Sequence, residues 1–141
     1  MAVWHFQVAL IPAGSLPPIE TNERLDCLAS WRGVIKPDWE AIVSGILQKN
    51  KPWSPQVDTW GVSDTLQLYV LHNRGQMEDA FLRIDVRQEI GSILNTLLAR
   101  LRAAGLMFAF SNSDICEVSR HELDSRLKLS LAFVRFKKQR L

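Results

Sequence analysis

The chain has few of the residues on which covalent and metal-centred chemistry depends. Its 141 residues include two cysteines, and Cys27 and Cys116 lie 89 positions apart, which predicts buried thiols rather than a disulfide framework or a CxxC motif. His5, His72 and His121 lie in separate segments without the HxH or HExxH spacing of metal sites. The motifs GxSxG, GxGxxG and GxxxxGK[ST] are also missing. The sequence therefore predicts no catalytic residue, no metal and no cofactor.

Long hydrophobic runs and a strong charge of one sign are lacking too. No stretch approaches the roughly 18 apolar residues of a membrane-spanning helix, and the first residues lack the basic start of a signal peptide. The formal net charge is +2, which is too small to indicate nucleic-acid binding. Seven basic and two acidic residues fall within 120–141, and ten basic and thirteen acidic residues precede them. We expect a cytoplasmic protein without a membrane or nucleic-acid partner, and a short basic tail at 136–141.

The hydrophobic pattern predicts one α+β domain over residues 1–141. Alternation predicts strands over 3–11, 65–72, 77–87 and 106–112, and spacing by three and four predicts helices over 37–47, 89–104 and 119–134. A turn at 72–76 joins the second and third strands as a hairpin. Residues 115–119 either continue the fourth strand or pair with it, and the proline-rich segment 12–36 could hide a further strand.

In chain order these elements read β-α-β-β-α-β followed by a helix. This order is typical of the ferredoxin-like plan, an antiparallel sheet with two helices on one face. We therefore predict a two-layer sandwich, with the C-terminal helix covering an edge or the second face of the sheet. Ser119 and Glu122 form an S-x-x-E capping box at the start of that helix. Its buried face is predicted at Leu123, Leu127, Leu131 and Val134.

The strand over 77–87 carries the most suggestive polar pattern. Arg83, Asp85 and Arg87 alternate with apolar residues, so they share one face with Phe81. A carboxylate between two guanidinium groups could hold an anionic ligand. Alternatively, Asp85 pairs with its neighbours or caps the following helix near Gln88, which is a purely structural role.

Tryptophan is abundant in the least regular part of the chain. Four of the five tryptophans, Trp31, Trp39, Trp53 and Trp60, fall within thirty residues of one another. They either pack beneath the long connection or line a groove for a partner, since aromatic residues dominate both cores and interfaces. Trp53 lies between prolines and is expected to be the most exposed.

Several short motifs resemble a group of small bacterial proteins of unknown function. They are Trp60-Gly61, the R-x-D-x-R strand at 83–87, and the S-x-A-x-R-F pattern of SLAFVRF at 130–136, which contains Arg135. The resemblance covers roughly residues 57–136 and implies a bacterial cytoplasmic protein, in some cases an immunity-type binder that accompanies a toxin. It transfers no catalytic residue.

Together these observations predict a non-enzymatic cytoplasmic protein that binds another protein in an immunity-like manner. The candidate contact residues are Arg83, Asp85, Arg87, Trp53, Trp60 and Arg135. The alternative is a binder of a small anionic ligand, or an enzyme, that uses Arg83, Asp85 and Arg87 in a cleft between the sheet and segment 12–36. A homodimer is also possible, because two-fold assemblies are common.

Overall fold

The computed structural model describes residues 5–22, 24–62, 64–87, 91–130, 134–135 and 137–138. Its strands are β1 (His5–Pro12), β2 (Ile19–Glu20), β3 (Leu25–Asp26), β4 (Val57–Gly61), β5 (Leu66–Asn73), β6 (Gln76–Asp85), β7 (Leu106–Ala109) and β8 (Ile115–Glu117). Its helices are α1 (Leu28–Trp31), α2 (Trp39–Val43), α3 (Gly91–Ala103) and α4 (Arg120–Leu129). Six strands form one antiparallel sheet in the order β4-β5-β6-β1-β7-β8, and β2 and β3 pair separately.

The β5–β6 hairpin forms where the alternating sequence predicted it. Leu68 lies opposite Leu82, and both side chains are fully buried. The turn residues Arg74 and Gly75 have positive φ angles of 52° and 80°, the backbone of a two-residue turn whose twist matches the strands. On the other side of β6, Val8 of β1 also lies opposite Leu82. The apolar face is therefore continuous over three strands.

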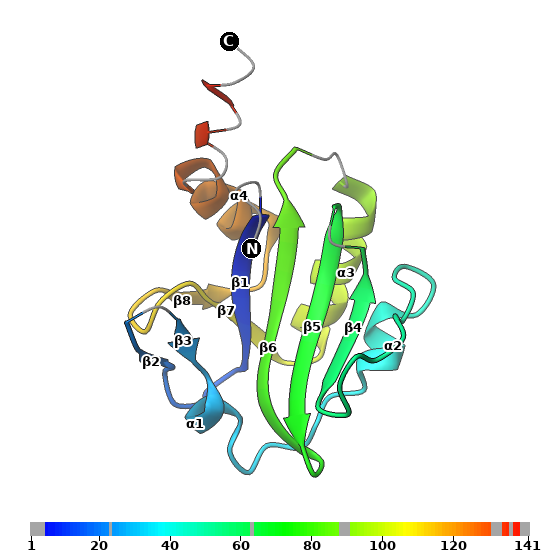
Figure 1. Ribbon diagram of the computed structural model, residues 1–141. Coiled ribbons are helices and arrows are strands. Elements are labelled where there is room, and N and C mark those ends of the chain that lie inside the picture. The colour runs from blue at the N-terminus through cyan, green and yellow to red at the C-terminus, as the bar shows by residue number, and fades with distance from the viewer. Residues whose placement is uncertain are drawn as a thin grey trace.

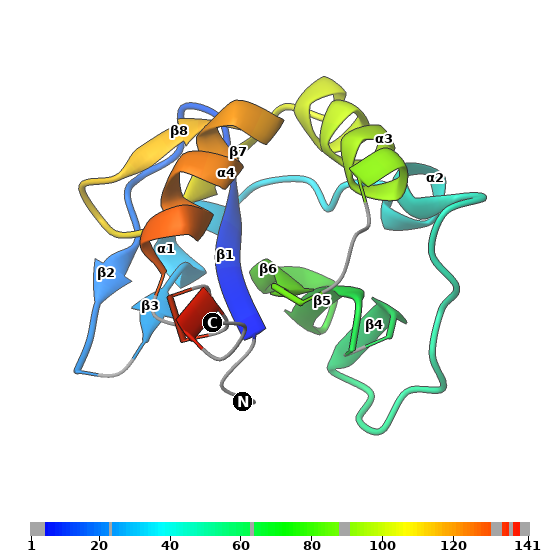
Figure 2. The same cartoon turned by 90° about the horizontal axis from the view of Figure 1, so that it is seen from above.

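Helices cover that apolar face. Figure 2 shows α3 and α2 on one side of β6, β5 and β4, with α4 beside β7 and β8. The helix predicted over 89–104 forms as α3 and buries Leu94, Leu97, Leu98 and Leu101. Ile93, which the apolar spacing placed on the same stripe, is 41% exposed. Gly105 follows with a φ of 80°, the left-handed conformation that ends many helices. Helix α2 is shorter than the predicted 37–47, because Gly45 takes a φ of 77° and turns the chain.

The buried face predicted for the C-terminal helix is wrong in part. Leu123 is fully buried and Leu127 is partly buried, but Val134 is 40% exposed. Helix α4 ends before Ser130, whose backbone is extended, so one apolar stripe does not continue to Val134. Leu131 lies outside the described residues.

The proline-rich segment 12–36 contains short elements rather than a full strand. It forms the two-residue strands β2 and β3 and then α1 (Figure 1). Trp31 anchors the segment, because its ring is fully buried and its Nε1 donates a 3.1 Å hydrogen bond to the Leu10 carbonyl of β1. This connection holds β3 and α1 close to the central strands.

The mixed α+β class with an antiparallel sheet and helices is confirmed. The ferredoxin-like order is not confirmed for the sheet, because β4 and β8 extend it at both edges beyond the four strands of that plan. The pairing of 115–119 with the preceding strand is realised as β7–β8. No helix in the described ranges is both long and apolar enough to cross a membrane.

Candidate functional site

Among the described residues, α2 and α3 cover only one face of the central strands, and α1 approaches the other face near Asp79. In the part of the chain that the structure describes, α2 and α3 lie behind β6, β5 and β4 in Figure 1, and the opposite face is turned toward the viewer. Because side chains alternate along a strand, residues between the buried core positions point to this side. We define the uncovered face by these residues of β1, β5 and β6: His5, Gln7, Ala9, Gln67, Tyr69, Leu71, Asp79, Phe81, Arg83 and Asp85.

An aromatic and cationic stack occupies the middle of the uncovered face. Tyr69 and Phe81 are paired across β5 and β6, and their rings stack with centroids 4.7 Å apart and planes 11° apart. The Arg83 guanidinium lies 4.6 Å from the Tyr69 ring centroid and donates a 3.0 Å hydrogen bond to the tyrosine hydroxyl. Such contacts hold a guanidinium flat against an aromatic surface. Arg83 is thus positioned by Tyr69 and not by Asp85.

Asp85 and Arg87 form a local ion pair beside this stack. The Asp85 side chain is fully buried, and it accepts hydrogen bonds from the Arg87 backbone amide at 2.9 Å, from Nε at 3.0 Å and from a terminal nitrogen at 2.7 Å. These bonds lower the pKa of Asp85 below its ordinary value. Asp85 therefore closes a turn with Arg87. The proposed cap near Gln88 lies outside the described residues.

Three buried polar atoms on the uncovered face have no hydrogen-bond partner in the described residues. They are His5 Nδ1, Gln67 Oε1 and Arg83 Nε. Gln67 and Arg83 are directly paired across β5 and β6. The acceptor Gln67 Oε1 and the donor Arg83 Nε therefore belong to neighbouring side chains but form no hydrogen bond with each other. Unpaired buried polar atoms are rare in proteins and often mark sites with a further role. His5, Gln67 and Tyr69 were missed from sequence, although their alternation with apolar residues was a usable signal.

A cleft opens between β3 and the uncovered face. Its volume is about 330 Å³, and it is lined by Gln7, Ala9, Arg24, Leu25, Leu71, Asp79, Phe81, Ala109 and Phe110. A smaller cavity of about 150 Å³ adjoins it and shares Arg24, Leu25, Leu71 and Asp79. The larger volume falls near the lower end of the roughly 300–1,000 Å³ typical of small-molecule sites. A cleft between the sheet and segment 12–36 was expected, but its charged residues are Arg24 and Asp79 rather than Arg83, Asp85 and Arg87.

The electrostatics of the cleft centre on Asp79. Burial raises the pKa of this carboxyl to about 6, while hydrogen bonds from the Ala80 amide at 2.9 Å and from the Cys27 thiol oppose the rise. Burial and the nearby Asp79 charge also raise the pKa of Cys27, so its thiol stays protonated. Arg24 lines the same cleft but forms no ion pair with Asp79.

The remaining candidate residues lie elsewhere. Trp53 is 74% exposed, as predicted, in the connection before β4, whereas Trp60 is 2% exposed and belongs to the core. Trp60 is therefore packed beneath the surface, with the Lys49 ammonium 5.7 Å from its ring. Arg135 is exposed in the short described stretch 134–135. The structure does not bring these three residues together with Arg83, Asp85 and Arg87.

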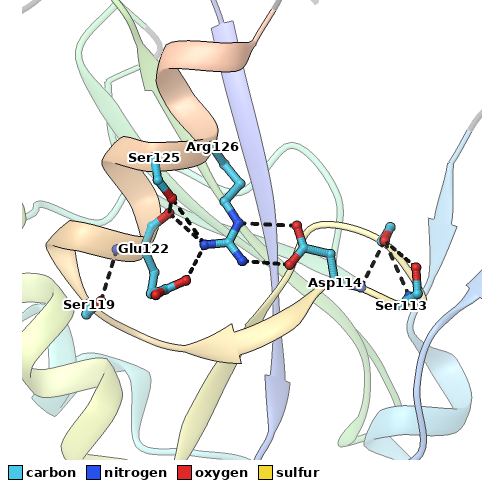
Figure 3. A network of polar contacts seen from close by, with 7 residues as sticks. Ser113, Asp114, Ser119, Glu122, Ser125 and Arg126 are labelled. Atoms are coloured by element: carbon cyan, nitrogen blue, oxygen red, sulfur yellow. Dashed lines mark hydrogen bonds and ion pairs between the residues drawn. The ribbon is translucent and has the colours of Figure 1, made fainter.

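A polar network on α4 has a structural role (Figure 3). Arg126 donates to both carboxylate oxygens of Asp114, at 2.7 and 3.2 Å, and also contacts Glu122. Half of the predicted capping box is present: Ser119 accepts a 3.1 Å hydrogen bond from the Glu122 amide, whereas the Glu122 carboxylate contacts Arg126. These bonds join α4 to the connection before β8. Asp114 accordingly has a lowered pKa, because Arg126 binds its charged form.

A shallow groove of about 720 Å³ separates α3 from α4. Its basic side chains already have partners, because Arg102 contacts Glu117 and Arg120 bonds Asp124 and Asn95. In the described ranges, no group of three or more histidine, cysteine, aspartate or glutamate side chains could hold a metal ion. The uncovered face and its cleft are therefore the better candidate site.

Comparisons with known proteins identified no relative of this chain. No family model matches the chain, and no significant match was found among curated proteins or solved structures. These comparisons assign no family. The resemblance to small bacterial proteins stays an expectation.

Proposed function

We propose that this chain is a non-enzymatic binding protein whose partner is another protein, held against the uncovered face. The observation that carries the proposal is the stack of Arg83, Tyr69 and Phe81 at the centre of the sheet face that points away from α2 and α3. Arginine and tyrosine are enriched among the residues that dominate interface energies, and such residues cluster near the middle of an interface. An immunity-like role and a cytoplasmic location belong to this proposal, and the two free thiols support a reducing compartment.

The side chains of the stack are already ordered without a partner. Arg83 is fixed by its hydrogen bond and its ring contact, and Tyr69 is fixed by the stacked Phe81. Side chains that are already ordered lose less conformational entropy when a partner covers them. The partner best suited to this surface presents an apolar or aromatic centre to the two rings, with hydrogen-bond acceptors around it for the guanidinium group.

The test places a photo-crosslinking amino acid at Gln7, an exposed position on the uncovered face. The matched control is Thr96, which is exposed on α3 on the other side of the sheet. In native cells, we expect one discrete heterologous crosslinked product from position 7 and none from position 96. Arg83→Ala should abolish that product while the variant keeps a cooperative melting transition.

Two outcomes would overturn the proposal. Equal crosslinking from both positions would show that the uncovered face has no special role. A product consisting only of a second copy would show a homodimer, for which β8 is available as an edge strand of the sheet.

The ferredoxin-like relationship likewise stays a proposal for the four inner strands, which follow the order β5-β6-β1-β7.

The anionic-ligand alternative has less support from the geometry. Both guanidinium groups that would hold an anion already have partners, because Arg87 binds Asp85 and Arg83 binds Tyr69. An anion must compete with the buried Asp85 carboxylate for Arg87. Thermal-shift measurements with phosphate and dicarboxylates test this alternative, since a ligand present at 100 times its Kd adds about 2.7 kcal/mol of stability.

A further inference from the structure

We infer that the cleft beneath β3 binds a small hydrophobic amine, with the ammonium group against Asp79. This ligand site goes beyond the protein-binding function proposed above and does not depend on it. The inference starts from the shape of the site. The larger chamber of about 330 Å³ and the smaller one of about 150 Å³ share four lining residues, and Asp79 is the one carboxylate among the four.

Among the described residues, the Asp79 carboxylate has no ion-pair partner, and Arg24 acts on it only from beyond ion-pair distance. Its hydrogen bonds come from the Ala80 amide and the Cys27 thiol. The carboxylate is half-buried, and this burial raises its pKa although the charge of Arg24 acts in the opposite direction. A positive group placed in the cleft would therefore be attracted by a carboxylate whose charge Arg24 offsets only in part.

The other charged groups around the cleft favour a cation over an anion. Asp26 and Glu78 line the smaller cavity together with Asp79, and Arg24 is the one basic residue in the lining of either chamber. Arg24 is exposed, so its guanidinium group is well solvated and repels a bound cation weakly. An anion near Arg24 would be repelled by the three carboxylates that line the smaller cavity with it.

The walls of the cleft select an organic cation. Leu25, Leu71 and Phe81 supply apolar surface beside the carboxylate, and an aromatic ring also attracts a cation over its face. Metal ions such as Ca²⁺ require six or more oxygen ligands, whereas one carboxylate among hydrophobic side chains suits a single ammonium group. The expected ligand thus has one protonated amine joined to a compact apolar or aromatic body.

The test uses 2-phenylethylamine as the probe, with 2-phenylethanol as a neutral analogue of the same shape. Binding to the full chain is measured by titration calorimetry and by NMR chemical-shift perturbation at pH 7.5. We expect the amine to bind at least tenfold more tightly than the alcohol, and shifts to gather at Leu71, Asp79 and Phe81. The preference should shrink as the pH falls below 6, because Asp79 then gains a proton.

Two variants complete the experiment. Asp79→Asn keeps the shape of the side chain and should remove the tenfold preference for the amine. The matched control is Asp58→Asn, which changes a carboxylate on β4 that already pairs with His72 at 2.9 Å and with Lys49 at 3.6 Å, and it should retain the preference. Equal binding of amine and alcohol, an unchanged preference in Asp79→Asn, or no amine binding at millimolar concentration would each overturn the inference. None of these results affects the crosslinking test at Gln7.

Discussion

The substitution Asp79→Asn should stabilise the unliganded protein at neutral pH. The pKa of Asp79 rises from its ordinary value of 3.8 to about 6 on folding, so the folded state binds a proton more tightly than the unfolded state. The contribution of Asp79 to the free energy of unfolding is most favourable below pH 3.8 and is lost as the pH rises through 6. At about 1.4 kcal/mol per pH unit, the loss approaches 3 kcal/mol at pH 7.5. Asparagine is neutral at every pH, so the Asp79→Asn variant does not lose this stability as the pH rises.

Urea unfolding of both proteins between pH 4 and pH 7.5 measures this effect. The difference in unfolding free energy between variant and wild type should be near its minimum at pH 4 and increase by about 2–3 kcal/mol by pH 7.5. Asp114→Asn serves as a control of opposite sign, because Arg126 lowers the pKa of Asp114 and that variant should lose stability above pH 4. A pH-independent difference for Asp79→Asn would refute the reasoning, since it would mean that Asp79 titrates alike in both states.

Three further substitutions test the fold. Leu82→Ala removes a fully buried side chain that lies opposite both Val8 and Leu68, and urea unfolding should show a loss of about 3–4 kcal/mol. Gly61→Ala should prevent normal folding, as judged by circular dichroism, because φ is 87° and a Cβ there would lie 2.2 Å from the Leu66 carbonyl oxygen. Ser119→Ala should cost about 1 kcal/mol through loss of the α4 cap, and hydrogen exchange should increase in the first turn of α4 while α3 keeps its protection.

Local patterns in the sequence predicted the central elements well. The alternation around Leu68 and Leu82 and the leucine stripe of α3 each need one buried face, and such faces leave a clear period in the chain. Helix α2 was overestimated because apolar spacing continues past Gly45, while the positive φ of that glycine ends the helix. Val134 was misjudged for a related reason, since the extended backbone at Ser130 interrupts the face that it would share with Leu123.

The sequence predicted only the part of the candidate site that lies on a single strand, β6. Alternation correctly placed Arg83 and Asp85 on the face opposite Leu82, but their partners depend on tertiary structure. The stacking of Arg83 on Tyr69 requires the register of β5 against β6. The cleft requires Arg24 to approach Asp79, and these residues are far apart in the sequence. Nothing in the irregular segment 12–36 specifies that approach by itself.

The thiol next to Asp79 provides an internal reporter for movements of segment 12–36. Cys27 is 1% exposed, and its raised pKa keeps the nucleophilic thiolate scarce. Alkylating reagents should modify it only when β3 and α1 separate from the sheet. The rate of iodoacetamide labelling at Cys27, separated from that at the half-buried Cys116 by peptide mass spectrometry, therefore records how often this segment detaches.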